Sequence, residues 1–156
     1  MKFTEPIDDR IREEDRILKK YPKIFRQKDL AITQSCMPWG LDIGRGWMPL
    51  IEFVCSYTQN CIDEYKLPQL EATQVKEKFG GLRFYYCWRS DDHIPKDDEP
   101  ERMDWIEDMI SFAETISEHI CETCGTMVGV SQTTGWIVTL CENCMKERND
   151  KTNLNK

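Results

Sequence analysis

Apolar side chains recur every three or four residues in three stretches of the chain, a spacing typical of helices that bury one face. The first stretch covers 8–21 and ends before Pro22, and the second covers 47–65. In the third stretch, 101–120, the apolar side chains on one face are Met103, Ile106, Met109, Ile110, Ala113, Ile116 and Ile120. We therefore expect three amphipathic helices and an irregular segment at 23–46.

Between the second and third helices the pattern changes to β-rich runs on either side of Gly80-Gly81. Two consecutive glycines suit a tight hairpin loop because they accept a positive φ without a side-chain clash. The sequence therefore predicts a hairpin over 73–88 with these glycines as its loop. The expected cross-strand pairs are Phe79 with Leu82, Lys78 with Arg83, Glu77 with Phe84, and Lys76 with Tyr85.

Strand alternation gives this hairpin an apolar face and a basic, aromatic face. The basic face carries Lys76, Lys78, Arg83 and Tyr85, together with Gln74, Cys87 and Arg89. Like charges that face each other destabilise a hairpin, so these cations require an anion nearby. Solvent or the chain's own acidic segment 91–108, a phosphate-bearing ligand, and the acidic surface of a partner protein are the three candidates. Glu77 falls on the apolar face, where we expect Arg45 or Arg89 to pair with it.

The loop Gly44-Arg45-Gly46 comes directly before the second helix. Its backbone N–H groups would suit an anion, and Arg45 is then a further candidate ligand-binding residue beside the basic face. The loop lacks the third glycine of a dinucleotide fingerprint and the Lys-Ser/Thr of a P-loop. The alternative is a tight turn in which Trp39 and Trp47 close the core.

Two cysteine pairs near the C-terminus predict a metal site. Cys121 and Cys124 form one Cys-x-x-Cys turn, Cys141 and Cys144 form the other, and 16 residues separate them. This spacing is typical of a zinc ribbon, in which each turn presents two thiolates to one Zn²⁺ ion. Four protein ligands leave no open coordination position, so the zinc is expected to be structural. Four buried thiols or a redox pair remain the alternative interpretation.

Charge and catalytic chemistry narrow the function further. The net charge is −7, and 91–108 holds nine acidic and two basic residues, which accounts for the whole excess. Broad attraction to nucleic acid or anionic lipid is therefore not expected. The two histidines, His93 and His119, belong to no HExxH motif, and the chain has no nucleophile elbow. We expect a binding protein and not an enzyme.

Four segments of the chain together resemble a family of small proteins found in phages and bacterial genomes. They are Trp39-Gly40, Gly44–Ile51, Gln74–Tyr85 with its Lys-Phe-Gly-Gly-Leu-Arg-Phe-Tyr stretch, and the C-terminal cysteine pairs. The resemblance covers about 15–145 and implies a mobile-element context. It brings no catalytic residues with it.

These patterns predict an α+β protein whose helices pack on a small antiparallel sheet, with a C-terminal zinc ribbon. Its parts are an α+β domain at 1–120, the ribbon at 121–145 and a flexible tail at 146–156. The N-terminal residues lack the apolar core of a signal peptide, so we expect the cytoplasm (the host's, if the protein is phage-encoded) and no membrane contact.

The expected function is that of a non-catalytic zinc-containing protein that binds a host protein, as a regulator or an inhibitor of host defence. One alternative is a nucleotide or phosphate-metabolite binder that uses the basic face. The other is a nucleic-acid-binding zinc ribbon. It is less favoured because no Lys or Arg lies between Cys124 and Cys141 to contact phosphates.

Overall fold

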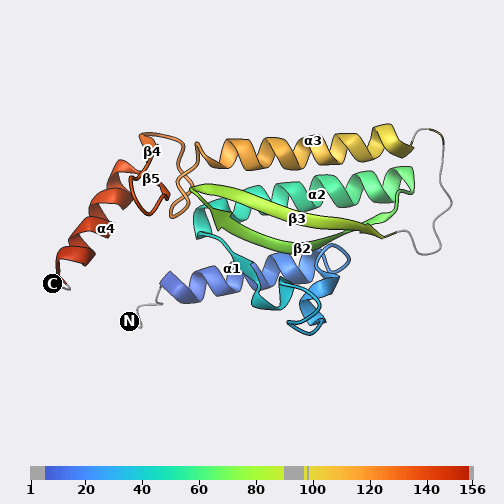
Figure 1. The fold of residues 1–156 in the computed structure, drawn as a ribbon, viewed down its shortest axis with the longest axis horizontal. Coiled ribbons are helices and arrows are strands. Elements are labelled where there is room, and N and C mark those ends of the chain that lie inside the picture. Colours follow the sequence, from blue (N-terminus) through green and yellow to red (C-terminus); the bar gives the residue numbers. More distant parts are fainter. Residues whose placement is uncertain (1–5, 90–96, 98, 155–156) are drawn as a thin grey trace.

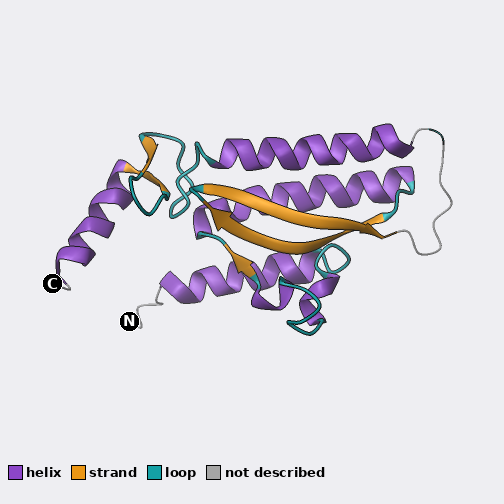
Figure 2. Cartoon of the chain, in the orientation of Figure 1, coloured by secondary structure: helices purple, strands orange, loops and turns teal. Residues whose placement is uncertain are grey.

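The computed structural model describes residues 6–89, 97 and 99–154 (Figure 1, Figure 2). The α-helices are α1 (Pro6–Lys20), α2 (Met48–Tyr65), α3 (Glu99–Ser117) and α4 (Glu142–Leu154). The strands are β1 (Leu41–Asp42), β2 (Gln69–Lys78), β3 (Gly81–Arg89), β4 (Val130–Gln132) and β5 (Thr139–Cys141). The three helices expected from the apolar spacing are present, and short 3-10 turns occupy part of 23–46.

The main sheet has the order β1-β2-β3 and is mixed. Strand β1 pairs in parallel with β2, placing Leu41 opposite Val75, whereas β2 and β3 pair antiparallel. The expected α+β class with helices on a small sheet is therefore confirmed, but the sheet also contains a parallel strand. A strand of two residues is too short to show any alternation, so the sequence did not predict β1.

The hairpin loop is Phe79-Gly80, and the predicted loop Gly80-Gly81 is wrong. Phe79 and Gly80 have φ values of 54° and 76°, the positive values of a type I′ turn. The observed pairs are Lys78 with Gly81, Glu77 with Leu82, Lys76 with Arg83, Val75 with Phe84, and Gln74 with Tyr85. For each residue of β2, the observed partner on β3 lies two positions before the predicted one. Because an even shift leaves the alternation unchanged, every side chain here keeps its predicted face.

A register shift between Ala72 and Gln74 then reverses the alternation in β2. Beyond it, Leu70 and Ala72 are fully buried and belong to the core. Glu71 pairs with Cys87 and lies on the same side of the sheet as the basic face. The irregularity therefore places a carboxylate on a face that otherwise carries cations.

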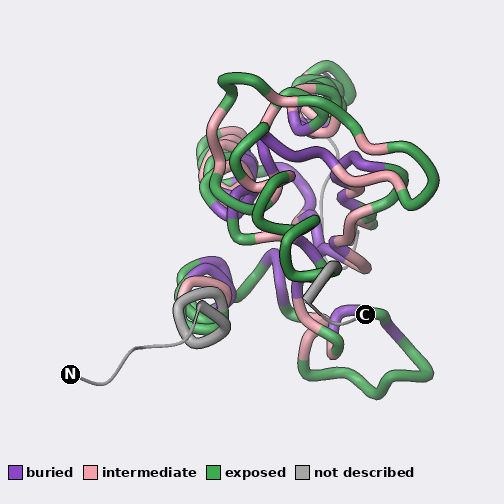
Figure 3. Tube along the Cα trace, turned by 90° about the vertical axis from the view of Figure 1, so that its left-hand side faces the viewer, coloured by how far each residue is buried: buried purple, intermediate pink, exposed green. Residues whose placement is uncertain are grey.

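Helices α2 and α3 lie side by side along the sheet, and α1 runs below it (Figure 1). One core joins them, and its largest fully buried side chains include Ile17, Ile24, Phe25, Met37, Trp47, Ile51, Leu82 and Ile106. Viewed from the α4 end, buried stretches gather where the elements face one another (Figure 3). Trp47 closes this core as expected, but Trp39 does not, because 74% of its surface is exposed.

Side chains of helix α3 also accept hydrogen bonds from backbone N–H groups at the outer edge of β3. The backbone N–H of Leu82 donates to Ser117 Oγ (2.8 Å), and that of Phe84 donates to Glu114 Oε1 (2.7 Å). These edge N–H groups have no neighbouring strand, so side chains from the helix complete their hydrogen bonds. The edge of the sheet is therefore covered along this part of β3.

The C-terminal segment forms a small unit of its own at one end of the molecule (Figure 1). Strands β4 and β5 pair antiparallel, and a second small core contains Cys121, Leu140 and Cys141. Helix α4 follows directly and extends to Leu154, through most of the segment expected to be a flexible tail. None of the helices in the described ranges combines the length and the apolar character that crossing a membrane requires.

Candidate metal centre

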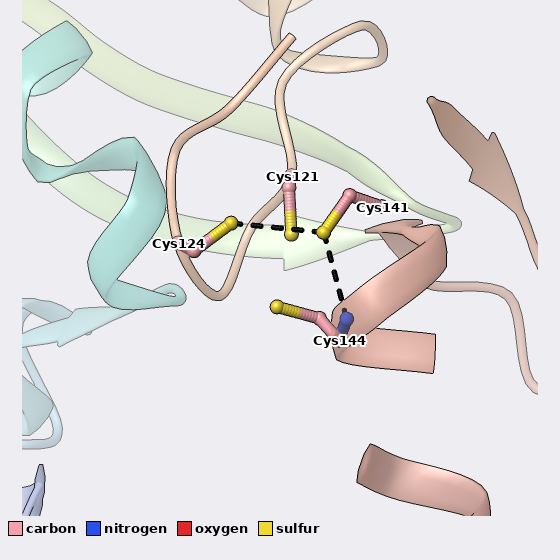
Figure 4. A group of neighbouring side chains, drawn as sticks. All are labelled: Cys121, Cys124, Cys141 and Cys144. Atoms are coloured by element: carbon pink, nitrogen blue, oxygen red, sulfur yellow. Dashed lines mark hydrogen bonds between the residues drawn. The ribbon is translucent and has the colours of Figure 1, made fainter. Parts of the chain in front are cut away.

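The four C-terminal cysteines meet in one cluster (Figure 4). The Sγ atoms of Cys121, Cys124, Cys141 and Cys144 all lie within 4.8 Å of one another. Those of Cys124 and Cys141 are 3.7 Å apart. A tetrahedral zinc ion with Zn–S bonds of about 2.3 Å would hold its sulfur ligands about 3.8 Å apart. The cysteines are therefore positioned to bind a metal ion, and the four-sulfur donor set is consistent with zinc.

Two different local structures present these thiols. In the first turn, the backbone N–H of Gly125 donates to Cys121 O (2.8 Å), and Gly125 has a φ of 78°. The second turn lies where β5 meets α4, and there the N–H of Cys144 donates to Cys141 Sγ (3.5 Å). This hydrogen bond, with the neighbouring thiols, lowers the pKa of Cys141 to about 7, whereas burial and the neighbouring thiols raise the pKa of Cys144.

The loop Gly44-Arg45-Gly46 and the following Trp47 hold the first cysteine turn against the body of the protein. The N–H of Gly46 donates to Glu122 O (2.7 Å), and Trp47 Nε1 donates to Ile120 O (2.9 Å). A Cβ atom on Gly44 would lie 2.1 Å from Glu122 O, and one on Gly46 would lie 2.1 Å from Cys121 O. Only glycine permits this approach of two backbones. We call this contact the loop clamp.

The tip of the hairpin holds the ribbon at a second place. The hydroxyl of Thr139 donates to Gly80 O (2.5 Å), and Gln132 Nε2 lies 3.5 Å from the same oxygen. A Cβ atom on Gly80 would lie 2.8 Å from Gln132 Nε2 and 2.9 Å from Ile137 Cγ2. We call this contact the hairpin clamp. The two segments that looked most like ligand-binding motifs in the sequence thus both fasten the cysteine ribbon to the body.

Four of the predicted ligand-binding residues do share one face of the hairpin. Lys76 lies directly opposite Arg83, and Lys76 Nζ lies 5.6 Å from the ring centroid of Tyr85. Lys78 stands at the tip, with its Nζ 5.4 Å from the Phe79 ring. Within the described ranges, no carboxylate forms an ion pair with any of these three cations. Their role as ligand contacts stays a prediction.

Arg45, the fifth candidate, lies apart from them. Its Nε is 3.7 Å from Glu13 Oε2, at the loop clamp. Arg45 does not pair with Glu77, which instead accepts a hydrogen bond from the N–H of Gly80 (2.6 Å). Arg89 does not pair with Glu77 either, because it forms an ion pair with Glu71 (3.5 Å). The expected pairing of Glu77 with either arginine is therefore wrong.

The buried carboxylate that sequence reasoning missed is Glu71, whose side chain is 4% exposed. Arg26 Nε donates to it at 2.6 Å, and Gln27 Nε2 donates at 3.2 Å. Burial by itself would raise the pKa of Glu71, but these hydrogen bonds, with Arg26 and Arg89 nearby, bring it below its ordinary value. The carboxylate is thus charged and already neutralised, so it does not compensate the cations on the same face.

The acidic segment 91–108 is described only in part, and His93 lies outside the described residues. Among its described members, Glu107 accepts a hydrogen bond from Trp88 Nε1 (3.0 Å) on β3. His119 is exposed in the turn that follows α3. No family model, curated protein or solved structure matches this chain. The resemblance to small phage and bacterial proteins therefore stays a prediction.

Proposed function

We propose that this chain is a non-catalytic, zinc-containing binding protein that acts on a host protein, in a phage or other mobile-element context. The metal is proposed to be zinc because a closed shell of four thiolates in Cys-x-x-Cys turns is typical of structural zinc sites. In that role the metal stabilises a segment whose own apolar core is small. The ribbon then serves as a rigid surface for recognition.

The observation that carries this proposal is the exposure of three large apolar side chains in the loops of the ribbon. Met127 is 59% exposed, Val128 is 81% exposed and Trp136 is 77% exposed. Large exposed apolar side chains on a structured surface are typical of protein contact sites, and tryptophan is a frequent contributor of binding energy in them. The same segment has no Lys or Arg between its cysteine pairs, which disfavours nucleic acid.

The proposal is tested by capture of a partner from host lysate with the zinc-loaded chain and two variants. We expect Trp136→Ala and Val128→Ser to lose the captured protein, because each removes exposed apolar contact area. Phe112→Ala is the matched control, since Phe112 is 60% exposed but lies on α3, outside the ribbon. Equal capture by all four proteins would show that the ribbon is not the binding surface.

A further inference from the structure

Part of the basic face of the hairpin lines an open, shallow cavity of about 450 Å³. The opposite wall is the segment between α1 and β1, which supplies Gln27, Gln34 and Ser35. The hairpin side supplies Gln74, Lys76 and Tyr85. This volume lies within the range of small-molecule sites, and the cavity adjoins the predicted ligand-binding residues.

Three amide side chains give the cavity its polar character. Gln34 Oε1 accepts from the N–H of Ala31 (3.3 Å), which leaves its NH₂ group to donate elsewhere. Gln27 donates to Glu71 and Cys87 through Nε2, which leaves its carbonyl oxygen as an acceptor. In the part of the chain that the structure describes, Gln74 has no side-chain hydrogen bond. Adjacent amide donors and acceptors suit the hydrogen-bonding edge of a nucleobase.

The positive charge on this face lies beside the cavity, and Asp42 on β1 is the register partner of Lys76. Lys76 and Arg83 face each other across the hairpin, an arrangement that is unfavourable unless an anion lies between or beside them. Arg83 Nη1 donates to the neighbouring Leu82 O (2.6 Å), and Lys76 lies against the Tyr85 ring. The nearest buried acid on this face, Glu71, is already paired with Arg26 and Arg89. Of these two cations only Lys76 lines the cavity, so a phosphate group bound there would meet the Lys76 ammonium group.

We propose that this cavity binds a nucleoside phosphate. The amides of Gln27, Gln34 and Gln74 would bond the edge of the base. Tyr85, which is 41% exposed, offers an aromatic surface for the base to stack on. Lys76 holds the phosphate. This site is separate from the apolar surface of the ribbon, so binding of a host protein and binding of a nucleotide can be tested independently.

The test is isothermal titration of the zinc-loaded full chain with ATP, GTP, CTP, UTP and their monophosphates, and with inorganic phosphate alone. We expect at least one nucleotide to bind at least tenfold more tightly than inorganic phosphate, because phosphate makes none of the base contacts. No binding of any nucleotide at millimolar concentration would overturn the proposal. So would equal affinity for phosphate and nucleotide, or binding of single-stranded RNA alone.

Three variants distinguish this cavity from other sites. Lys76→Ala and Tyr85→Ala should each weaken nucleotide binding at least tenfold, and Gln74→Glu should do so by placing a carboxylate beside the phosphate. Gln74→Glu changes a partly exposed side chain and is expected to fold normally, which a thermal melt of the zinc-loaded protein checks. Lys146→Ala on α4 is the control and should bind as the unmodified chain does. Unchanged affinity in the three cavity variants would overturn the proposal.

Discussion

At the scale of single residues, Gly44, Gly46 and Gly80 act through what lies against them. The sequence predicts the four cysteine ligands, because their spacing alone is specific. It does not predict why these glycines are needed, because the atoms that a Cβ would strike belong to segments from 52 to 79 residues further along the chain, as from Gly80 to Gln132 and from Gly46 to Gly125. A close approach of two backbones leaves no signal beyond the glycine itself.

Gly46→Ala is expected to destabilise the zinc-loaded protein by about 1–3 kcal/mol, the range for overpacking a filled site. The new methyl group would lie 2.1 Å from Cys121 O and 2.5 Å from Gly125 N, and both are backbone atoms that cannot rotate away. Urea unfolding measures the change. Gly135→Ala is the control: its Cβ meets nothing within 4 Å, so it reports only the cost of a φ of 78°. A smaller loss in Gly46→Ala than in Gly135→Ala would contradict the loop clamp.

The hydrogen bonds of Glu52 predict that the free energy of unfolding depends on pH. Hydrogen bonds from Arg16 (2.8 Å to Oε1) and Lys20 (2.7 Å) lower the pKa of Glu52 to about 2 from an ordinary value of 4.5. A lowered pKa stabilises the folded state above about pH 4.5, and this contribution is lost as the pH falls toward 2.

We therefore expect Glu52→Gln to lower stability at pH 7 by less than about 1 kcal/mol, because its partners Arg16 and Lys20 are about half exposed to solvent. Thermal melts of both proteins from pH 7 to pH 2.5 measure the difference between them. That difference should shrink steadily below pH 4.5. A difference that stays constant down to pH 2.5 would contradict the pairing.

At the scale of the elements, the hairpin shows which structural features the sequence pattern predicts and which it does not. Alternation predicts its two faces correctly near the loop, because side-chain direction depends only on the parity of the register. The loop itself was misplaced by one residue, since two glycines are a better local choice than Phe79-Gly80. The observed loop puts Gly80 O within reach of the Thr139 hydroxyl (2.5 Å), a contact that only the folded ribbon provides.

Phe79→Asn is expected to stabilise the protein by about 0.5–1 kcal/mol. Phe79 has a φ of 54°, a left-handed value that costs a phenylalanine more than an asparagine, and its side chain is 69% exposed. Urea unfolding again measures the effect. Phe112→Asn, at a similarly exposed position in a helix, should instead be neutral or destabilising. If Phe79→Asn destabilised the protein by more than Phe112→Asn, the assignment of the loop would be wrong.

Helix α4, in contrast, is an element that the apolar pattern of its own sequence does not predict. Its sequence from Glu142 to Leu154 has no apolar stripe, so periodicity predicts a polar tail. The structure begins the helix inside the second cysteine turn, with Glu142 at the first position and Lys151 in the last turn, where their charges suit the helix dipole. A helix that starts from a metal-binding turn cannot be recognised from its own apolar pattern.

At the scale of the whole molecule, the four-cysteine ribbon is fastened by two clamps to an α+β body with its own core. The two parts depend on different forces, because the body buries a large apolar cluster whereas the ribbon core is small. Metal removal should therefore act on them unequally. Hydrogen exchange with a strong zinc chelator is expected to show lost protection in 121–144 and retained protection in β2 and α2. Equal loss in both parts, or no loss in either, would contradict this division.

X-ray absorption at the zinc edge, on the protein as purified, tests the central claim most directly. We predict one zinc ion per chain with four sulfur neighbours at about 2.3 Å and no oxygen or nitrogen ligand. That result would establish a zinc site closed by four thiolates. An absence of zinc, or a zinc ion that also binds a water oxygen, would contradict the account.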